Sequence, residues 1–101
     1  MQFIRTRIKK DDYKDVERQE GFTIVRWDAV PETIQVPIRK KGKKDKGAEQ
    51  EYETKETNYL VCTERVYHGD FTADMVRADI DADLALRYPE GNAPTINVPE
   101  L

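Results

Sequence analysis

The stretch from Asn58 to Tyr88 places the strongest limit on what this chain can fold into. Its first part, NYLVCTERVYH, is an apolar run rich in β-branched and aromatic residues. Gly69 and Asp70 break that run, and the strongly helical segment FTADMVRADIDADLALRY follows. A chain of 101 residues with one such helix can bury one modest core. We therefore expect a single domain over 1–101 in which other segments pair with the apolar run.

The apolar run is predicted to be the central strand of a sheet, within a strand over residues 50–68. Leu60 and Val66 point to one side of an extended chain, whereas Val61 and Tyr67 point to the other. Apolar residues on both sides are typical of a strand at the centre of a sheet. Further strands are predicted where β-branched and aromatic residues gather, over 2–9, 22–28 and 33–40.

The helix is predicted over residues 71–88, with Asp70 or Thr72 capping its first turn and Pro89 ending it. At about 100° per residue, five residues form one apolar stripe. These are Ala73, Val76, Ile80, Leu84 and Tyr88. The fold class that follows is α+β, an antiparallel sheet of about four strands packed on one face by the C-terminal helix.

The connecting segments carry turn-forming residues. Residues 13–20 predict a loop or a single helical turn closed by Gly21, and Pro31 predicts a turn between two strands. Residues 40–48 contain five lysines and two glycines, which predicts a mobile basic hairpin loop. Residues 89–101 predict an irregular tail.

Pro37 limits where the strand over 33–40 can lie. Proline has no amide hydrogen to donate to a neighbouring strand. We therefore expect this strand at an edge of the sheet or at a bulge, and we favour the edge.

The charge is distributed unevenly, although the net charge is only −3. Residues 1–48 carry 13 Lys or Arg and 8 Asp or Glu, whereas residues 49–101 carry 4 and 12. The simplest interpretation is that the two halves lie side by side and partly neutralise each other. The alternative is a surface for nucleic-acid phosphates, for which the candidate residues are Arg5, Arg7, Lys40, Lys41, Lys43, Lys44 and Lys46.

One helix can cover only one face of the sheet, so apolar residues on the second face need another cover. A loop, a second copy of the chain or another protein could supply it. The candidate partner-binding residues on that face are Val25, Trp27, Tyr59, Val61 and Tyr67.

A metal-dependent hydrolase is a second alternative, with weak candidate ligands in His68, Asp70 and Asp74 at the corner between strand and helix. The helical aspartates do not converge on one face. Arg77 and Arg87 lie one turn from several of them, which predicts a solvated, salt-bridged helix surface. The sequence predicts no cofactor.

The leading hypothesis is a non-enzymatic interaction or assembly module that uses an uncovered sheet face or an edge strand to bind itself or a protein partner. The single Cys62 cannot form an internal disulfide, and no stretch is long and apolar enough to span a membrane. A cytoplasmic location is therefore expected. Size and charge are typical of an accessory protein of a bacterium or its mobile elements.

Overall fold

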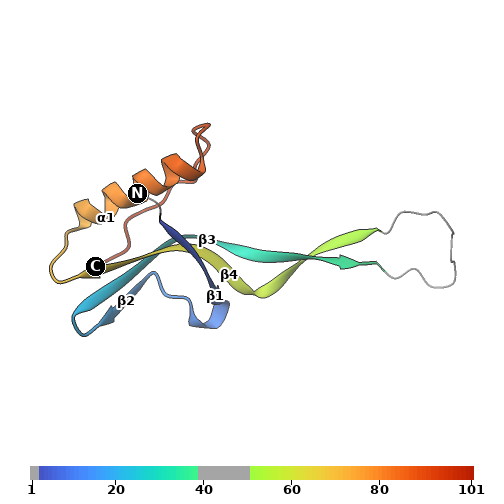
Figure 1. Cartoon of the computed structure of the whole chain (residues 1–101), viewed down its shortest axis with the longest axis horizontal. Helices are drawn as coiled ribbons and strands as arrows, with labels where there is room; N and C mark the ends of the chain where they lie inside the picture. Colours follow the sequence, from blue (N-terminus) through green and yellow to red (C-terminus); the bar gives the residue numbers. More distant parts are fainter. Residues whose placement is uncertain (1–2, 39–50) are drawn as a thin grey trace, which may run out of the picture.

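A computed structural model describes residues 3–38 and 51–101. In chain order the elements are β1 (Ile4–Lys9), the 3-10 turn η1 (Lys10–Asp12), β2 (Val16–Gln19), β3 (Phe22–Pro37), β4 (Tyr52–His68) and α1 (Ala73–Arg87). The strands form one antiparallel sheet in the order β1-β4-β3-β2, and α1 crosses one of its faces (Figure 1). The predicted α+β class is confirmed. The predicted loop 40–48 lies outside the described residues.

The apolar run lies at the centre of the sheet, as predicted. β1 pairs with one side of β4, from Ile4 opposite Glu64 to Lys9 opposite Tyr59. β3 pairs with the other side over a longer distance.

The predicted turn at Pro31 is wrong, because β3 runs unbroken through it. Instead of a turn, the pairing of β3 with β4 shifts register at two places, one between Trp27 and Val30 and one between Pro31 and Thr33. Asp28 sits in the first with a positive φ of 51°, a conformation that is uncommon for residues other than glycine. The segments predicted as two strands, 22–28 and 33–40, are therefore one bent strand.

The fourth strand is β2, where the sequence predicted a loop or a helical turn. Its partner is the start of β3, from Val16 opposite Val25 to Gln19 opposite Phe22. Gly21 has a φ of 85° and lies in the tight turn between the two strands. The polar composition of β2 is that of an exposed edge strand, which periodicity alone does not separate from a loop.

Helix α1 begins after Thr72, whose side-chain oxygen accepts a hydrogen bond from the Met75 amide at 3.2 Å. Val76, Ile80 and Leu84 of the predicted stripe are buried. Ala73 is exposed, and Tyr88 is only partly buried.

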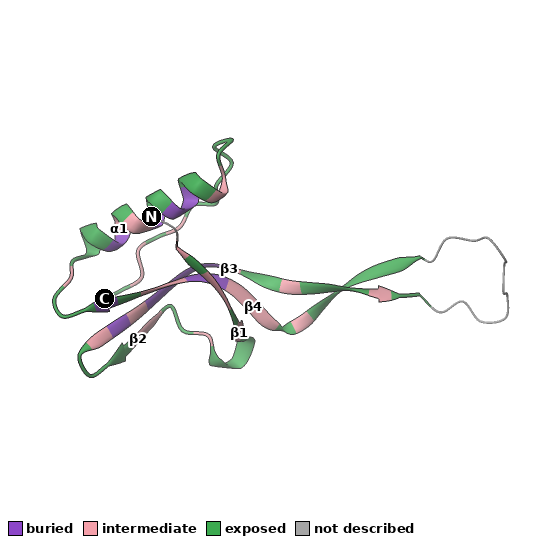
Figure 2. Ribbon diagram, in the orientation of Figure 1, coloured by how far each residue is buried: buried purple, intermediate pink, exposed green. Residues whose placement is uncertain are grey.

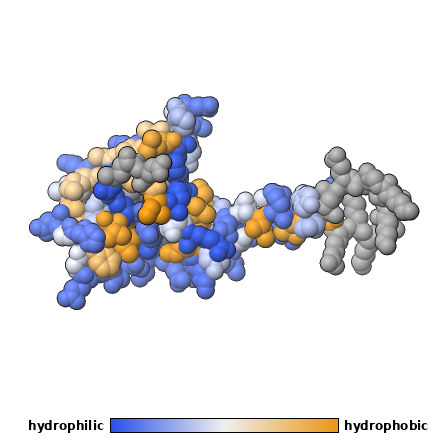
Figure 3. All heavy atoms as spheres, in the orientation of Figure 1, coloured by the Kyte–Doolittle hydropathy of each residue, from blue (hydrophilic) through white to orange (hydrophobic). Residues whose placement is uncertain are grey.

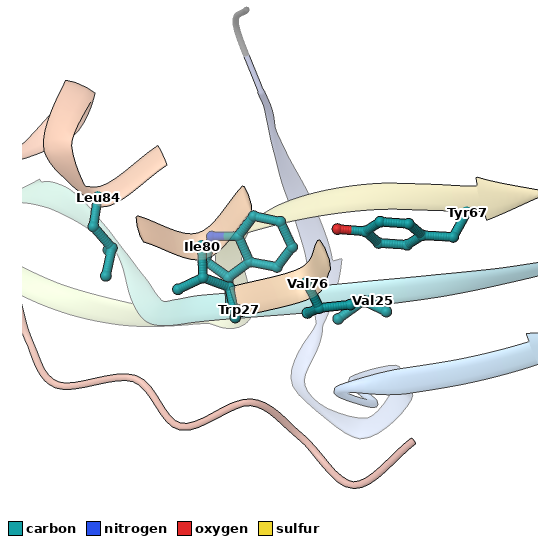
Figure 4. Close-up of a cluster of buried hydrophobic side chains, with 6 residues drawn as sticks. All are labelled: Val25, Trp27, Tyr67, Val76, Ile80 and Leu84. Atoms are coloured by element: carbon teal, nitrogen blue, oxygen red, sulfur yellow. The ribbon is translucent and has the colours of Figure 1, made fainter. Parts of the chain in front are cut away.

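The core lies between α1 and the sheet (Figure 4). The sheet contributes Val25, Trp27 and Tyr67. The helix therefore covers the face that the sequence analysis left without cover, and that expectation is corrected. Phe3 adds an edge-on ring contact with Trp27, with 6.0 Å between the ring centroids.

Residues 89–101 contain neither helix nor strand. The last residues nevertheless pack against the core through Ile96, Val98 and Leu101. The Arg77 guanidinium also donates to the Ile96 carbonyl. The tail thus closes one side of the core under α1.

Beyond the body, β3 and β4 continue as a two-stranded arm (Figure 1). We define the arm as Thr33–Pro37 of β3 with Tyr52–Glu56 of β4. Figure 2 shows that the buried residues gather in the body, whereas the arm is mostly exposed. The radius of gyration is 19.0 Å, well above the roughly 13 Å of a compact domain of this length.

Candidate functional site

The arm is anchored to the body by Arg7. The Arg7 guanidinium donates to Glu32 Oε1 at 3.0 Å and lies 3.6 Å from the centre of the Tyr59 ring. The Thr57 hydroxyl donates to the same Glu32 oxygen at 3.0 Å. Hydrogen bonding from Arg7 lowers the pKa of Glu32. These contacts fix the base of the arm at the point where β1 ends.

The arm exposes apolar side chains along β3. Ile34 is 50% exposed, Val36 is partly buried, and they lie opposite Lys55 and Glu53 of β4. On the other face Tyr52 is 56% exposed. Figure 3 shows hydrophobic residues along the arm, away from the body. An isolated two-stranded ribbon is marginally stable in water, so this arm is a suitable element to receive cover from another protein.

The two long edges of the arm are unpaired in the described part of the chain. β1 pairs with β4 only as far as Tyr59, and β2 pairs with β3 only as far as Val25. Unpaired backbone groups along a strand edge are a template for a further strand. The arm therefore combines exposed apolar side chains with free hydrogen-bonding edges.

The predicted partner-binding residues divide into two groups. Val25, Trp27 and Tyr67 are at most 5% exposed and lie under α1, so their side chains are not accessible to a partner in this fold. Tyr59 and Val61 are partly buried at the base of the arm, where Val61 pairs with Val30.

The sheet face opposite α1 is open in part. Ile4 and Val66 are 69% and 41% exposed there. Arg26 on the same face is only 6% exposed because it binds Glu64 at 2.9 Å, the Lys14 carbonyl at 3.1 Å and Glu17 at 3.6 Å. The polypeptide between η1 and β2 thus covers part of this face, and the remainder is a mixed apolar and charged surface.

A buried polar network joins α1 to the sheet, and the sequence predicted only one part of it, the pairing of Asp83 with Arg87. Asp83 is 2% exposed and accepts hydrogen bonds from Trp27 Nε1 at 2.8 Å and the Thr63 hydroxyl at 2.9 Å. Arg87 adds an ion pair to the same carboxylate at 2.7 Å. Burial alone would raise the pKa of Asp83, but the hydrogen bonds from Arg87, Trp27 and Thr63 outweigh it and lower that pKa.

Asp28 forms the second half of this network. Its carboxylate pairs with Arg87 at 2.6 Å and accepts from the Tyr88 hydroxyl at 3.0 Å. Arg5 donates to the Asp28 carbonyl at 3.0 Å and to Thr63 Oγ1 at 3.1 Å. Two carboxylates and two guanidinium groups thus neutralise one another, and the left-handed turn at Asp28 is held by partners from β1 and from the end of α1.

A cleft of about 640 Å³ lies between the C-terminal tail and residues 26–30 of β3. Its walls include Tyr13, Trp27, Asp28 and Ile96. The Asp28 carboxylate already has internal partners. The cleft could therefore hold a molecule by its shape, but the buried Asp28 carboxylate in its wall is not free to bind one. We assign it no function.

The predicted metal ligands do not come together. His68 is exposed at the end of β4, where its ring lies 6.2 Å from that of Phe22. Asp70 and Asp74 are exposed on the loop and on the first turn of α1. Across residues 3–38 and 51–101, no group of three His, Cys, Asp or Glu side chains is arranged to hold a metal ion.

The nucleic-acid candidates are placed only in part. Arg5 and Arg7 both bind acceptors within the protein, as described above. The other candidates, Lys40, Lys41, Lys43, Lys44 and Lys46, lie outside the described residues.

Comparison with family models, with curated proteins and with solved structures found no match. Among the described residues, no helix has the length and apolar character needed to cross a membrane.

Proposed function

We propose that this protein is an interaction or assembly module whose arm binds another protein. The observation that carries the proposal is the arm itself, a ribbon with exposed Ile34 and Tyr52 and two unpaired edges. A core of this size does not need such an extension, because the buried cluster lies wholly in the body. The apolar side chains and edge groups of the arm would be covered by the partner.

The anchoring of the arm supports this role. Arg7 and Thr57 hold Glu32 at the base, so the ribbon leaves the body in a defined direction. A preoriented element loses less conformational freedom on binding than a flexible one. The buried, unpaired thiol of Cys62 suits a reducing, cytoplasmic setting for this interaction.

Photo-crosslinking tests the proposal. A benzoylphenylalanine residue is introduced at Tyr52, which is 56% exposed on β4 of the arm, and, as a matched control, at Leu86, which is 61% exposed on α1. In cells that make the protein, illumination should give a discrete protein adduct from position 52 and none from position 86. No adduct at position 52, or the same adducts at both positions, would refute the proposal.

A further inference from the structure

We propose that the arm binds a second copy of this chain, with the free edges of the two β4 strands pairing antiparallel about Thr54. The two arms then form one four-stranded sheet in the order β3-β4-β4-β3. This inference rests on the proposed function, since it names the protein that the arm would bind. Three observations support it: the direction of the backbone groups, the position of Pro37, and the charges of Glu53 and Lys55.

The direction of the backbone groups follows from the last bond of the ladder. The Ile38 amide donates to the Glu51 carbonyl at 2.9 Å, so the backbone groups of these two residues point toward each other. Direction alternates along a strand. The amide and carbonyl groups of Tyr52, Thr54 and Glu56 therefore point away from β3, into the free edge.

The free edge of β3 is less suited to a new strand. By the same alternation, the outward positions of β3 within the arm are Thr33, Gln35 and Pro37. Pro37 has no amide hydrogen, so this edge lacks one of its three donors. The edge of β4 contains no proline and keeps all three, the third of them next to η1, where Lys10 pairs with the Glu56 side chain at 3.3 Å.

The charges select one register. When two copies pair antiparallel about Thr54, Glu53 of each copy lies opposite Lys55 of the other. This is a pair without backbone hydrogen bonds, in which the side chains come closest, at about 4.5 Å between Cα atoms. Thr54 then faces Thr54, and Tyr52 faces Glu56. Within one chain Lys55 Nζ lies 3.3 Å from Glu53 Oε1, and the two side chains remain 57% and 50% exposed, so each can also contact its opposite in a second copy.

Neighbouring registers place like charges opposite each other. Pairing about Glu53 sets that carboxylate against its own copy, and pairing about Lys55 does the same for the two ammonium groups. Pairing about Tyr52 or Glu56 also brings glutamates together. Like charges directly opposite are destabilising, so the Thr54 register is the favoured one.

The edge of β1 does not offer the same match. A self-pairing centred on Thr6, in the middle of that strand, would put Arg5 opposite Arg7. Same-sign charges along an edge discourage pairing. The alternating signs along β4 are complementary in the antiparallel arrangement.

Charge reversal in solution tests the inference. Sedimentation equilibrium is measured at low salt on the full chain, up to about 1 mM because an interface of this size is weak. The native protein should dimerise reversibly. The symmetric dimer contains two opposed pairs of residues 53 and 55, and in either single variant, Glu53→Lys or Lys55→Glu, both pairs carry like charges. Each variant should therefore raise the dimer dissociation constant about tenfold or more. The double variant Glu53→Lys/Lys55→Glu restores opposite charges and should return the constant close to the native value.

Two results would overturn the inference. One is a native protein that remains monomeric at the highest concentration. The other is a double variant that dimerises no better than the single ones. If the protein is monomeric but position 52 still gives an adduct with a different protein, the proposed function stands and only the choice of partner is wrong. If position 52 gives no adduct either, both fail.

Discussion

Asp83 and Asp81 lie two residues apart on α1 and have opposite environments. Asp81 is exposed and pairs with Arg77 one turn away, whereas Asp83 is buried against Trp27 and Thr63. Exposed pairs of this kind contribute little to stability, while the buried carboxylate of Asp83 cannot be removed without leaving the donors of Trp27 and Thr63 unpaired. The two positions therefore form a matched pair for mutation.

Replacement of Asp83 by Ala should lower the free energy of unfolding by about 3 kcal/mol, because Arg87, Trp27 and Thr63 each lose an acceptor in a buried site. The control Asp81→Ala should change it by less than about 0.5 kcal/mol. Urea denaturation followed by Trp27 fluorescence measures both. Equal effects of the two substitutions would show that the network does not hold the helix to the sheet.

The lowered pKa of Asp83 predicts a loss of stability in acid. Because the folded state lowers this pKa, the contribution of the carboxylate is fully present above the ordinary value of 3.8 and is lost as the pH falls through the lowered pKa. The stability difference between the native protein and Asp83→Asn should therefore be largest near neutral pH and shrink below about pH 4. A difference that stays constant from pH 7 to pH 3 would contradict this assignment.

Residue identity did not reveal Asp83 as a buried group. The sequence correctly predicted its pairing with Arg87, since the two lie four residues apart. It predicted a solvated side chain because Asp83 lies at the border of the apolar stripe. At that position a small rotation of the helix determines whether the side chain faces water or the sheet. Trp27 and Thr63, which donate hydrogen bonds to the Asp83 carboxylate, come from strands whose register the sequence does not specify.

At the scale of elements, the elements anchored by strong local patterns were predicted well. Alternation identified β1 and β4, and the apolar stripe with Thr72 identified α1. The errors came from residues whose effect depends on the neighbouring strand. Pro31 is tolerated because an irregularity in the pairing with β4 accommodates it. The same dependence explains why the face covered by α1 was predicted wrongly: both faces of β4 carry apolar residues.

The arm and the body should be separable elements. A variant in which Asn-Gly replaces residues 35–54 joins Ile34 to Lys55, an opposed pair whose backbone groups face each other, by a turn suited to a two-residue hairpin. We expect it to keep its helix signal in circular dichroism and a thermal midpoint within about 5 °C of the native one, because no core residue is removed. An unfolded variant would show that the arm is part of the folding unit.

At the scale of the molecule, the uneven charge of the sequence is partly neutralised on folding. Arg26 binds Glu64 and Lys10 binds Glu56, so residues of the basic half meet residues of the acidic half. The long axis, 63 Å against 33 and 20 Å for the others, reflects the arm. Residues 49–57 alternate but offer little to bury, which predicts a hairpin that extends beyond the core. How far it projects depends on where β1 and β2 stop, and no local pattern encodes that.

The free edge of β4 is inferred to take a partner strand, and amide hydrogen exchange at Thr54 measures that pairing at a single residue. This amide points away from β3, so bonds within one chain do not protect it. We predict that protection of the Thr54 amide rises with protein concentration, while the outward amide of Gln35 on β3 continues to exchange freely. Fast exchange at Thr54 at every concentration, or protection that rises equally at Gln35, would contradict it.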